Sequence, residues 1–400
     1  MVEPVLLERY ADLIVSLGAN VQEGQIVAVE AAPEAQPLVH AVVARAYDAG
    51  ARYVDVSYID PIVKRIRLER ARDETLEFIP PWLGQRLLGL GEADSARIVL
   101  VPTVPPGVLA GVDPARAARD RLPSLPEVFT LLAERSTNWT LSPYPLRAWA
   151  ERVYSGDGDA VERLWRDIVH VCRLDEPDPA AAWRERVQGL HEMATRIDAL
   201  GLDALHFEGP GTDLTVGLLP SSTFAGDGPG SRTRRGIVHY PNIPTEEIFS
   251  TPDPQRADGV VTATKPLDVA GATITGLRMR FEGGRVVELE AEQNADVLRG
   301  RVGVDEGARR LGEVALVDRE GRIGTLDRTF FNTLLDENAA SHVALGSAYV
   351  SGVRDEADLA RINRSDIHID FMIGSNDVDV TGVGRDGSRV PLLRGGAWQL

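Results

Sequence analysis

The first 145 residues alternate apolar runs of strand length with longer stretches of helical periodicity. The strand-like runs lie at 25–31, 52–60, 96–104 and 138–145. The helical stretches lie at 5–17, 34–51, 61–92 and 113–134. Strands separated by helices predict helical crossovers and a mainly parallel sheet. Residues 145–200 are also rich in helical patterns, so we expect an α/β N-terminal domain over residues 1–200.

After residue 200 the pattern changes to short alternating runs separated by glycine-rich turns. The stretch "FEGGRV" at 281–286 is typical of a β-hairpin. Only a few helices are expected in this half, such as 292–300 and 302–311. The pattern predicts an α+β C-terminal domain rich in antiparallel strands over residues 201–400.

Charge and composition exclude several classes of protein. The net charge of −17 disfavours sequence-independent binding to nucleic acid, which needs lysine and arginine against phosphate. No segment approaches the ~20 apolar residues of a membrane span. The opening "MVEPVLLERYADL" lacks the basic region of a signal peptide, so we expect a cytoplasmic protein. The single cysteine, Cys172, excludes an internal disulfide framework and a cysteine-based zinc site.

Two of the seven histidines have carboxylates at spacings that suit a metal site. His342 follows Glu337 by five residues in "FNTLLDENAASHVALG", where polar groups interrupt a core-like run. His368 and Asp370 are two apart in the strand-like "DIHIDFMIGS", so their side chains share a face. The alternative for the second pair is an ordinary exposed polar face. The other histidines have contexts that favour structural roles: His40, His170, His191, His206 and His239.

Two further carboxylates stand beside apolar runs in the same half of the chain. Glu247 lies in "PNIPTEEIFSTPDP", where prolines stiffen the loop, and Glu313 leads into the apolar run of "RRLGEVALVD". A carboxylate entering a buried run is costly unless it is paired or binds a cation. The alternatives are an acidic loop for Glu247 and a solvent-facing strand end for Glu313.

The combined donors are four carboxylates and two imidazoles. Mixed oxygen and nitrogen ligands suit Zn²⁺, Mn²⁺, Co²⁺ or Fe²⁺. Six ligands are too many for one tetrahedral ion, but they suit two ions bridged by a carboxylate, an arrangement used for hydrolysis. The predicted metal ligands are Glu247, Glu313, Glu337, His342, His368 and Asp370.

The order and spacing of these motifs resemble the thermophilic aminopeptidase T family of metallo-aminopeptidases (peptidase family M29). The resemblance also covers "LLERYADLIVSLGANVQEGQIVAVEA" and "ALHFEGPGTDLTVGL", and thus nearly the whole chain. It implies a two-metal exopeptidase that uses the six ligands above, accepts Zn, Co, Mn or Mg, and forms a homodimer. Tyr349 in "ALGSAY" matches the family's catalytic tyrosine, and Glu313 its acid/base candidate. The segment between Tyr349 and His368 is a few residues shorter than the family pattern.

The mechanism expected from the resemblance is removal of N-terminal amino acids from peptides by water activated between two ions. Glu313 or Glu337 would transfer the proton, and Tyr349 would donate to the developing oxyanion. A core or interface aromatic is the alternative role for Tyr349. Two other functions stay open at this point: another binuclear hydrolase, such as a carboxypeptidase or amidase, and a non-catalytic metal-binding protein.

Overall fold

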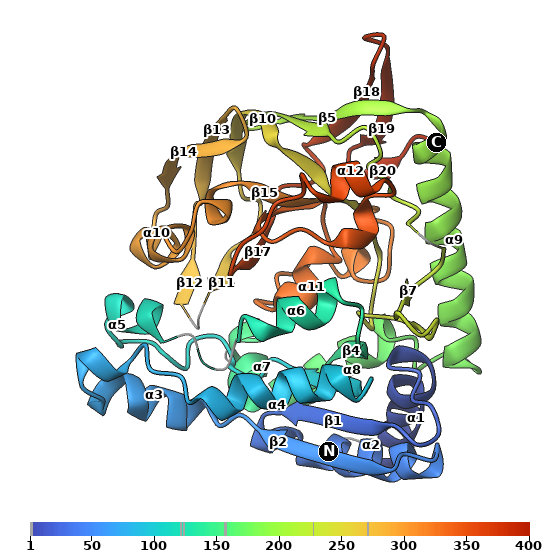
Figure 1. Ribbon diagram of the computed structural model, residues 1–400, viewed down its shortest axis with the longest axis vertical. Helices are drawn as coiled ribbons and strands as arrows, with labels where there is room; N and C mark the ends of the chain where they lie inside the picture. Colours follow the sequence, from blue (N-terminus) through green and yellow to red (C-terminus); the bar gives the residue numbers. More distant parts are fainter. Residues whose placement is uncertain (1–2, 121, 123–124, 156–157, 227, 270–271) are drawn as a thin grey trace. The chain divides into compact units, whose positions relative to one another are not determined.

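The computed structural model describes residues 3–120, 122, 125–155, 158–226, 228–269 and 272–400. The chain divides into two compact units. The first comprises Met1–Glu185, Gly230–Pro244 and Ala270–Ala272; the second comprises Arg186–Pro229, Thr245–Val269 and Thr273–Leu400. The first unit begins in the blue part of the colour scale in Figure 1, and the second ends in the red.

In the described residues, the first unit contains a four-stranded sheet of order β2-β1-β3-β4 in which every pairing is parallel. This confirms the parallel sheet predicted from the alternating pattern. Its strands are β1 (Ile26–Ala31), β2 (Tyr53–Tyr58), β3 (Ala96–Val101) and β4 (Asn138–Pro143).

The helices of the first unit occupy the predicted stretches, with proline at the breaks. The stretch 61–92 contains two helices, the second starting at Pro81. The stretch 113–134 also contains two, and Pro126, which lacks an amide donor, caps the second. The helices are α1 (Pro4–Leu13), α2 (Gln36–Asp48), α3 (Pro61–Arg70), α4 (Pro81–Glu92), α5 (Pro114–Arg119), α6 (Glu127–Ala133), α7 (Arg147–Val153) and α8 (Ala160–Val171). Helix α9 (Pro179–Ala199) follows them.

A segment from the second half of the sequence belongs to the first unit. The backbone of Leu141 in β4 hydrogen-bonds with Pro241 and Ile243, which extends the sheet edge. The same segment contains the short strands β7 (Ser231–Arg232) and β8 (Val238–His239). Residues 230–244 therefore complete the first unit although they follow α9 in sequence.

The largest sheet described in the second unit has eight strands in the order β14-β13-β10-β6-β5-β18-β19-β20, with antiparallel pairings. The predicted hairpin is present as β13 and β14. The strands are β5 (Leu202–Gly209), β6 (Thr212–Leu218), β10 (Pro252–Thr262), β13 (Arg278–Glu282), β14 (Arg285–Glu290), β18 (Asp379–Gly384), β19 (Arg389–Arg394) and β20 (Ala397–Trp398). Strands β11 (Leu267–Val269) and β12 (Ala272–Ile274) lie between β10 and β13 in sequence.

A second antiparallel sheet, of order β17-β16-β15-β9, lies in the same unit. Its strands are β9 (Glu247–Ser250), β15 (Leu311–Val317), β16 (His342–Gly346) and β17 (His368–Met372). Every residue of β15 and β16 is buried, so this sheet is part of the core of the second unit.

Residues 186–199 of the long helix α9 belong to the second unit, and the other helices described there are short. They are α10 (Ala295–Val302), α11 (Thr333–Glu337) and α12 (Glu356–Leu359). The prediction of a helix over 302–311 is wrong: only a single 3-10 turn, Gly307–Arg309, forms there, and β15 begins at Leu311. Among the residues that the structure describes, no helix combines the length and apolar character needed to cross a membrane.

Candidate metal centre

Pairing register brings predicted ligands to one face of the sheet β17-β16-β15-β9. Ala344 of β16 is opposite Glu313 on one side and Asp370 on the other, and Glu247 is opposite Val317. Opposed residues point to the same face, and so do residues two or four apart on one strand. The side chains of Glu247, Glu313 and Asp370 therefore project from the same face.

The two histidines project from this face as well. His342 precedes Ala344 by two residues on β16, and His368 precedes Asp370 by two residues on β17. Each is the first residue of its strand. The backbone bends between Glu337 and His342, since Glu337 ends α11 and His342 begins β16.

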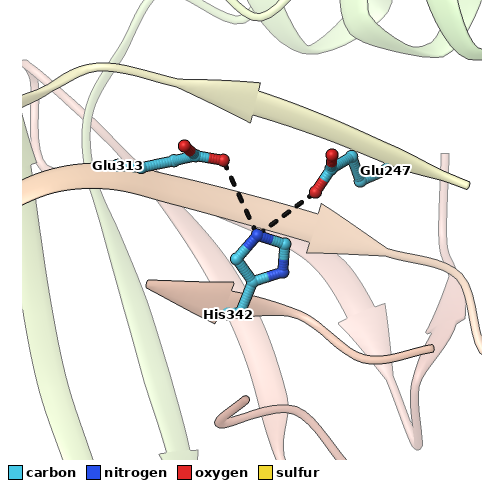
Figure 2. A group of neighbouring side chains, drawn as sticks. All are labelled: Glu247, Glu313 and His342. Atoms are coloured by element: carbon cyan, nitrogen blue, oxygen red, sulfur yellow. Dashed lines mark ion pairs between the residues drawn. The ribbon is translucent and has the colours of Figure 1, made fainter. Parts of the chain in front are cut away.

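One group of donors consists of Glu247, Glu313 and His342. The Nε2 atom of His342 lies 3.2 Å from Oε2 of Glu247 and 3.6 Å from Oε1 of Glu313. Figure 2 shows both carboxylates directed toward this imidazole from neighbouring strands. The side chains are 1 to 10% exposed, which places the donors away from bulk water.

A second group consists of Glu313, His368 and Asp370. The Nε2 atom of His368 lies 3.4 Å from Oε2 of Glu313 and 3.2 Å from Oδ1 of Asp370. Glu313 therefore belongs to both groups, with one carboxylate oxygen near each histidine. A carboxylate placed in this way could contribute one oxygen to each of two cations.

Backbone carbonyls orient both imidazoles. Nδ1 of His342 lies 3.2 Å from the carbonyl oxygen of Ala340, and Nδ1 of His368 lies 2.7 Å from that of Ser347. When Nδ1–H donates to a carbonyl, the lone pair is on Nε2, the atom that faces the carboxylates. This tautomer and orientation are those of a histidine that binds metal.

Glu337 is buried beside these groups. In the described part of the chain it joins neither three-residue group. Burial, followed by the negative charges of Asp370 and Glu247, raises its pKa well above the ordinary value. Its carboxylate is thus close enough to the others to be affected by their charge.

The electrostatics of the groups fit a bound cation. Burial opposes charge on His342, yet its contacts with Glu247 and Glu313 raise its pKa well above the ordinary value. Burial likewise opposes charge on Glu313, but contacts with His342 and His368 lower its pKa. Divalent ions would neutralise these buried carboxylates, and the oxygen and nitrogen donors suit such ions.

Tyr349 lies against the second group. Its ring centroid is 4.9 Å from that of His368 and 5.6 Å from that of Phe249. Burial raises the pKa of its phenol, so the hydroxyl keeps its proton at neutral pH. The Oγ1 atom of Thr251 donates to the carbonyl oxygen of Tyr349 at 2.7 Å and holds the backbone in place.

An ion pair beside Glu337 was not predicted from the sequence. Nζ of Lys265 lies 3.3 Å from the buried carboxylate of Asp336, which also accepts hydrogen bonds from the amides of Phe330 and Asn332. These contacts fix the start of α11. A sequence signal exists, since Lys265 is one of only two lysines in a chain with 43 basic residues.

Comparison with known proteins identifies the class of molecule. The chain matches the family described as "Thermophilic metalloprotease (M29)" over residues 5–398. It is 39% identical to aminopeptidase T of Thermus aquaticus and 36% identical to aminopeptidase AmpS of Bacillus subtilis (strain 168), with 98% of each chain covered. The structure of wild-type AmpT from Thermus thermophilus superposes with a TM-score of 0.86 at 38% identity, covering 99% of both chains.

The fold, the donor set and these similarities define a metallopeptidase, a class of hydrolase. The chain belongs to the M29 family of thermophilic metalloproteases. The resemblance seen in the motifs is thereby confirmed, and the relatives named above are aminopeptidases.

Proposed function

We propose that this protein is a two-metal aminopeptidase that removes N-terminal amino acids from peptides with a free N-terminus. The observation that carries the proposal is the shared Glu313, whose two oxygens lie near different histidines. The names of the relatives support cleavage at the N-terminus. In this proposal, the metal-binding catalytic domain expected over residues 201–400 corresponds to the second unit. The N-terminal domain expected over residues 1–200 corresponds to the first unit, which also includes residues 230–244.

The proposed ligands divide between two positions. Glu247, Glu313 and His342 would hold one ion, and Glu313, His368 and Asp370 the other, with Glu337 as the sixth ligand. Two divalent ions, such as Zn, Co, Mn or Mg, supply Lewis acidity and lower the pKa of water toward neutrality.

The remaining steps belong to side chains of the chain itself. Glu313 or Glu337 accepts the proton of the attacking water and returns it to the leaving amine. Tyr349 donates its phenol hydrogen to the oxyanion, and its contacts with His368 and Phe249 support that role. We further propose that the protein acts in the cytoplasm as a homodimer, with no nucleic-acid or membrane partner.

The proposal is tested with metal-free protein refilled with Zn²⁺, Co²⁺ or Mn²⁺. We expect release of p-nitroaniline from free-amine aminoacyl p-nitroanilides, and no release once the amine is acetylated. Cleavage of the acetylated substrates at an equal rate would support an amidase instead. Failure of every metal to restore turnover of any free-amine substrate would overturn the proposed function.

A further inference from the structure

Asn338 connects two segments that supply proposed ligands. Its side chain is fully buried. Oδ1 accepts a hydrogen bond of 2.6 Å from the backbone amide of Glu246, the residue before Glu247. Nδ2 donates to the carbonyl oxygen of Leu334 at 2.9 Å and lies 3.5 Å from Oε1 of Glu337. The side chain of Asn338 thus contacts the residue that precedes β9 and two residues of α11.

Two contacts made by Glu246 help to fix the segment in which Glu247 lies. Strand β9 has four residues, lies at the edge of its sheet and pairs with β15 alone in the described sheet. Glu247 is its first residue, where a short strand frays most easily. The bond from Asn338 holds the peptide just before it, and the carboxylate of Glu246 is paired with Arg186 at 2.5 Å.

A purely local role does not account for both halves of the Asn338 side chain. The bond to Leu334 alone would satisfy a free carbonyl at the end of α11. Oδ1, however, accepts from a residue 92 positions away in sequence. If Asn338 served only to cap the end of α11, its hydrogen bond with Glu246 would not be needed.

We propose that Asn338 is a positioning residue that fixes the Glu247 carboxylate relative to Glu337. This inference rests on the proposed function, because it assigns both residues to the metal centre. Residues that orient metal ligands typically change metal affinity by about 10- to 100-fold when removed. The hydrogen bond of Asn338 to the Glu247 segment is 2.6 Å long, whereas its contact with Glu337 is 3.5 Å. Because the stronger contact is with the Glu247 segment, loss of Asn338 weakens the ion held by Glu247, Glu313 and His342 more than the ion held by Glu313, His368 and Asp370.

The test is a Co²⁺ titration of the metal-free protein, followed by visible absorption and calorimetry. In N338A we expect one equivalent of Co²⁺ to bind at least about tenfold more weakly than in the wild type. The affinity for the other equivalent should change by less than about threefold. N338D keeps the acceptor for the amide of Glu246, so its loss should be at least about threefold smaller than that of N338A. If N338A does not fold, N338S replaces it in this comparison.

The matched control is Asn138→Ala in the first unit. Asn138 is also buried, donating to the carbonyl of Ala19 at 2.6 Å and accepting from Gln25 at 2.8 Å. N138A should lower thermal stability and leave both Co²⁺ affinities unchanged. Equal weakening of both equivalents in N338A, no weakening, or N338D as weak as N338A would each overturn the inference. A wild-type protein that binds no Co²⁺ would instead overturn the proposed function.

Discussion

Glu313 is the residue on which the candidate site depends most. Each of its oxygens lies within 3.6 Å of a different histidine, and it belongs to both donor groups. No other residue in these groups has that position. Substitutions at Glu313 and at a ligand of one group should therefore have different effects on metal content.

We expect Glu313→Gln to reduce the affinity for both ions and Glu247→Gln to reduce it for one. The fall in affinity should be at least about 100-fold, because a direct ligand contributes at least as much as an orienting residue. Metal analysis after dialysis against a weak chelator measures the remaining equivalents. Retention of two equivalents by E313Q would remove Glu313 from the bridging position.

Tyr349 is tested by Tyr349→Phe, which removes only the hydroxyl. Loss of one oxyanion donor lowers kcat by about 100- to 1,000-fold. Metal content and thermal stability should be preserved, because the ring contacts with Phe249 and His368 do not need the hydroxyl. Near-normal kcat with intact metal would assign Tyr349 a packing role alone.

On the sheet β17-β16-β15-β9, a small residue lies between two of the proposed ligands. Ala344 lies between Glu313 and Asp370 in the cross-strand register and is fully buried. Glu313 and Asp370 lie on strands with one strand between them, so their backbones are about 10 Å apart. Their carboxylates nevertheless approach the same imidazole, that of His368, at 3.4 and 3.2 Å. A side chain larger than that of Ala344 would compete with the two carboxylates for the space between the strands.

Ala344→Val should therefore lower metal content as well as stability. Overpacking of a core costs about 1–3 kcal/mol of unfolding free energy. The control is Ala204→Val on β5, another buried strand alanine, which should lose stability without losing metal. Equal metal content in the two variants would show that the small size of Ala344 does not matter for metal binding.

Sequence patterns predicted most of these elements because local periodicity sets strand and helix type. The spacing of His368 and Asp370 required only strand alternation. Strand alternation alone does not predict the face on which Glu313 lies, because the pairing of β15 with β16 changes register between Leu311 and Glu313. Such an irregularity depends on the partner strand, and nothing in "RRLGEVALVD" alone reveals it.

The whole molecule shows a second limit of sequence patterns. Residues 230–244 belong to the first unit, although the preceding β5 and β6 belong to the second. Hydrophobic periodicity shows that a segment is a strand and which face is buried, but it does not show which sheet it joins. The hydrogen bonds of Leu141 with Pro241 and Ile243 are made between residues about 100 positions apart, beyond the range of any local pattern.

Acid should destabilise the first unit through His239. Burial lowers the pKa of this histidine to about 4. Between pH 6.5 and pH 4 the unfolded chain binds a proton that the folded chain does not, so stability falls as pH falls through this window. The free energy of unfolding falls by about 3 kcal/mol in all, because each unit of difference in pKa contributes about 1.36 kcal/mol.

The measurement is denaturant unfolding of metal-free wild type and His239→Gln at pH 7 and pH 4.5. The difference in unfolding free energy between the two proteins should shrink or reverse at the lower pH, since glutamine does not titrate. A constant difference across this range would show that His239 keeps an ordinary pKa in the folded state.

The shared carboxylate has a consequence for how the two proposed ions communicate. If Glu313 bridges them, the binding of one ion orders a ligand of the other, and the two affinities become thermodynamically linked. Linkage is reciprocal, so each ion must change the affinity of its neighbour by the same factor. Stepwise chelation of the wild-type protein should then show that loss of the first ion changes the affinity for the second.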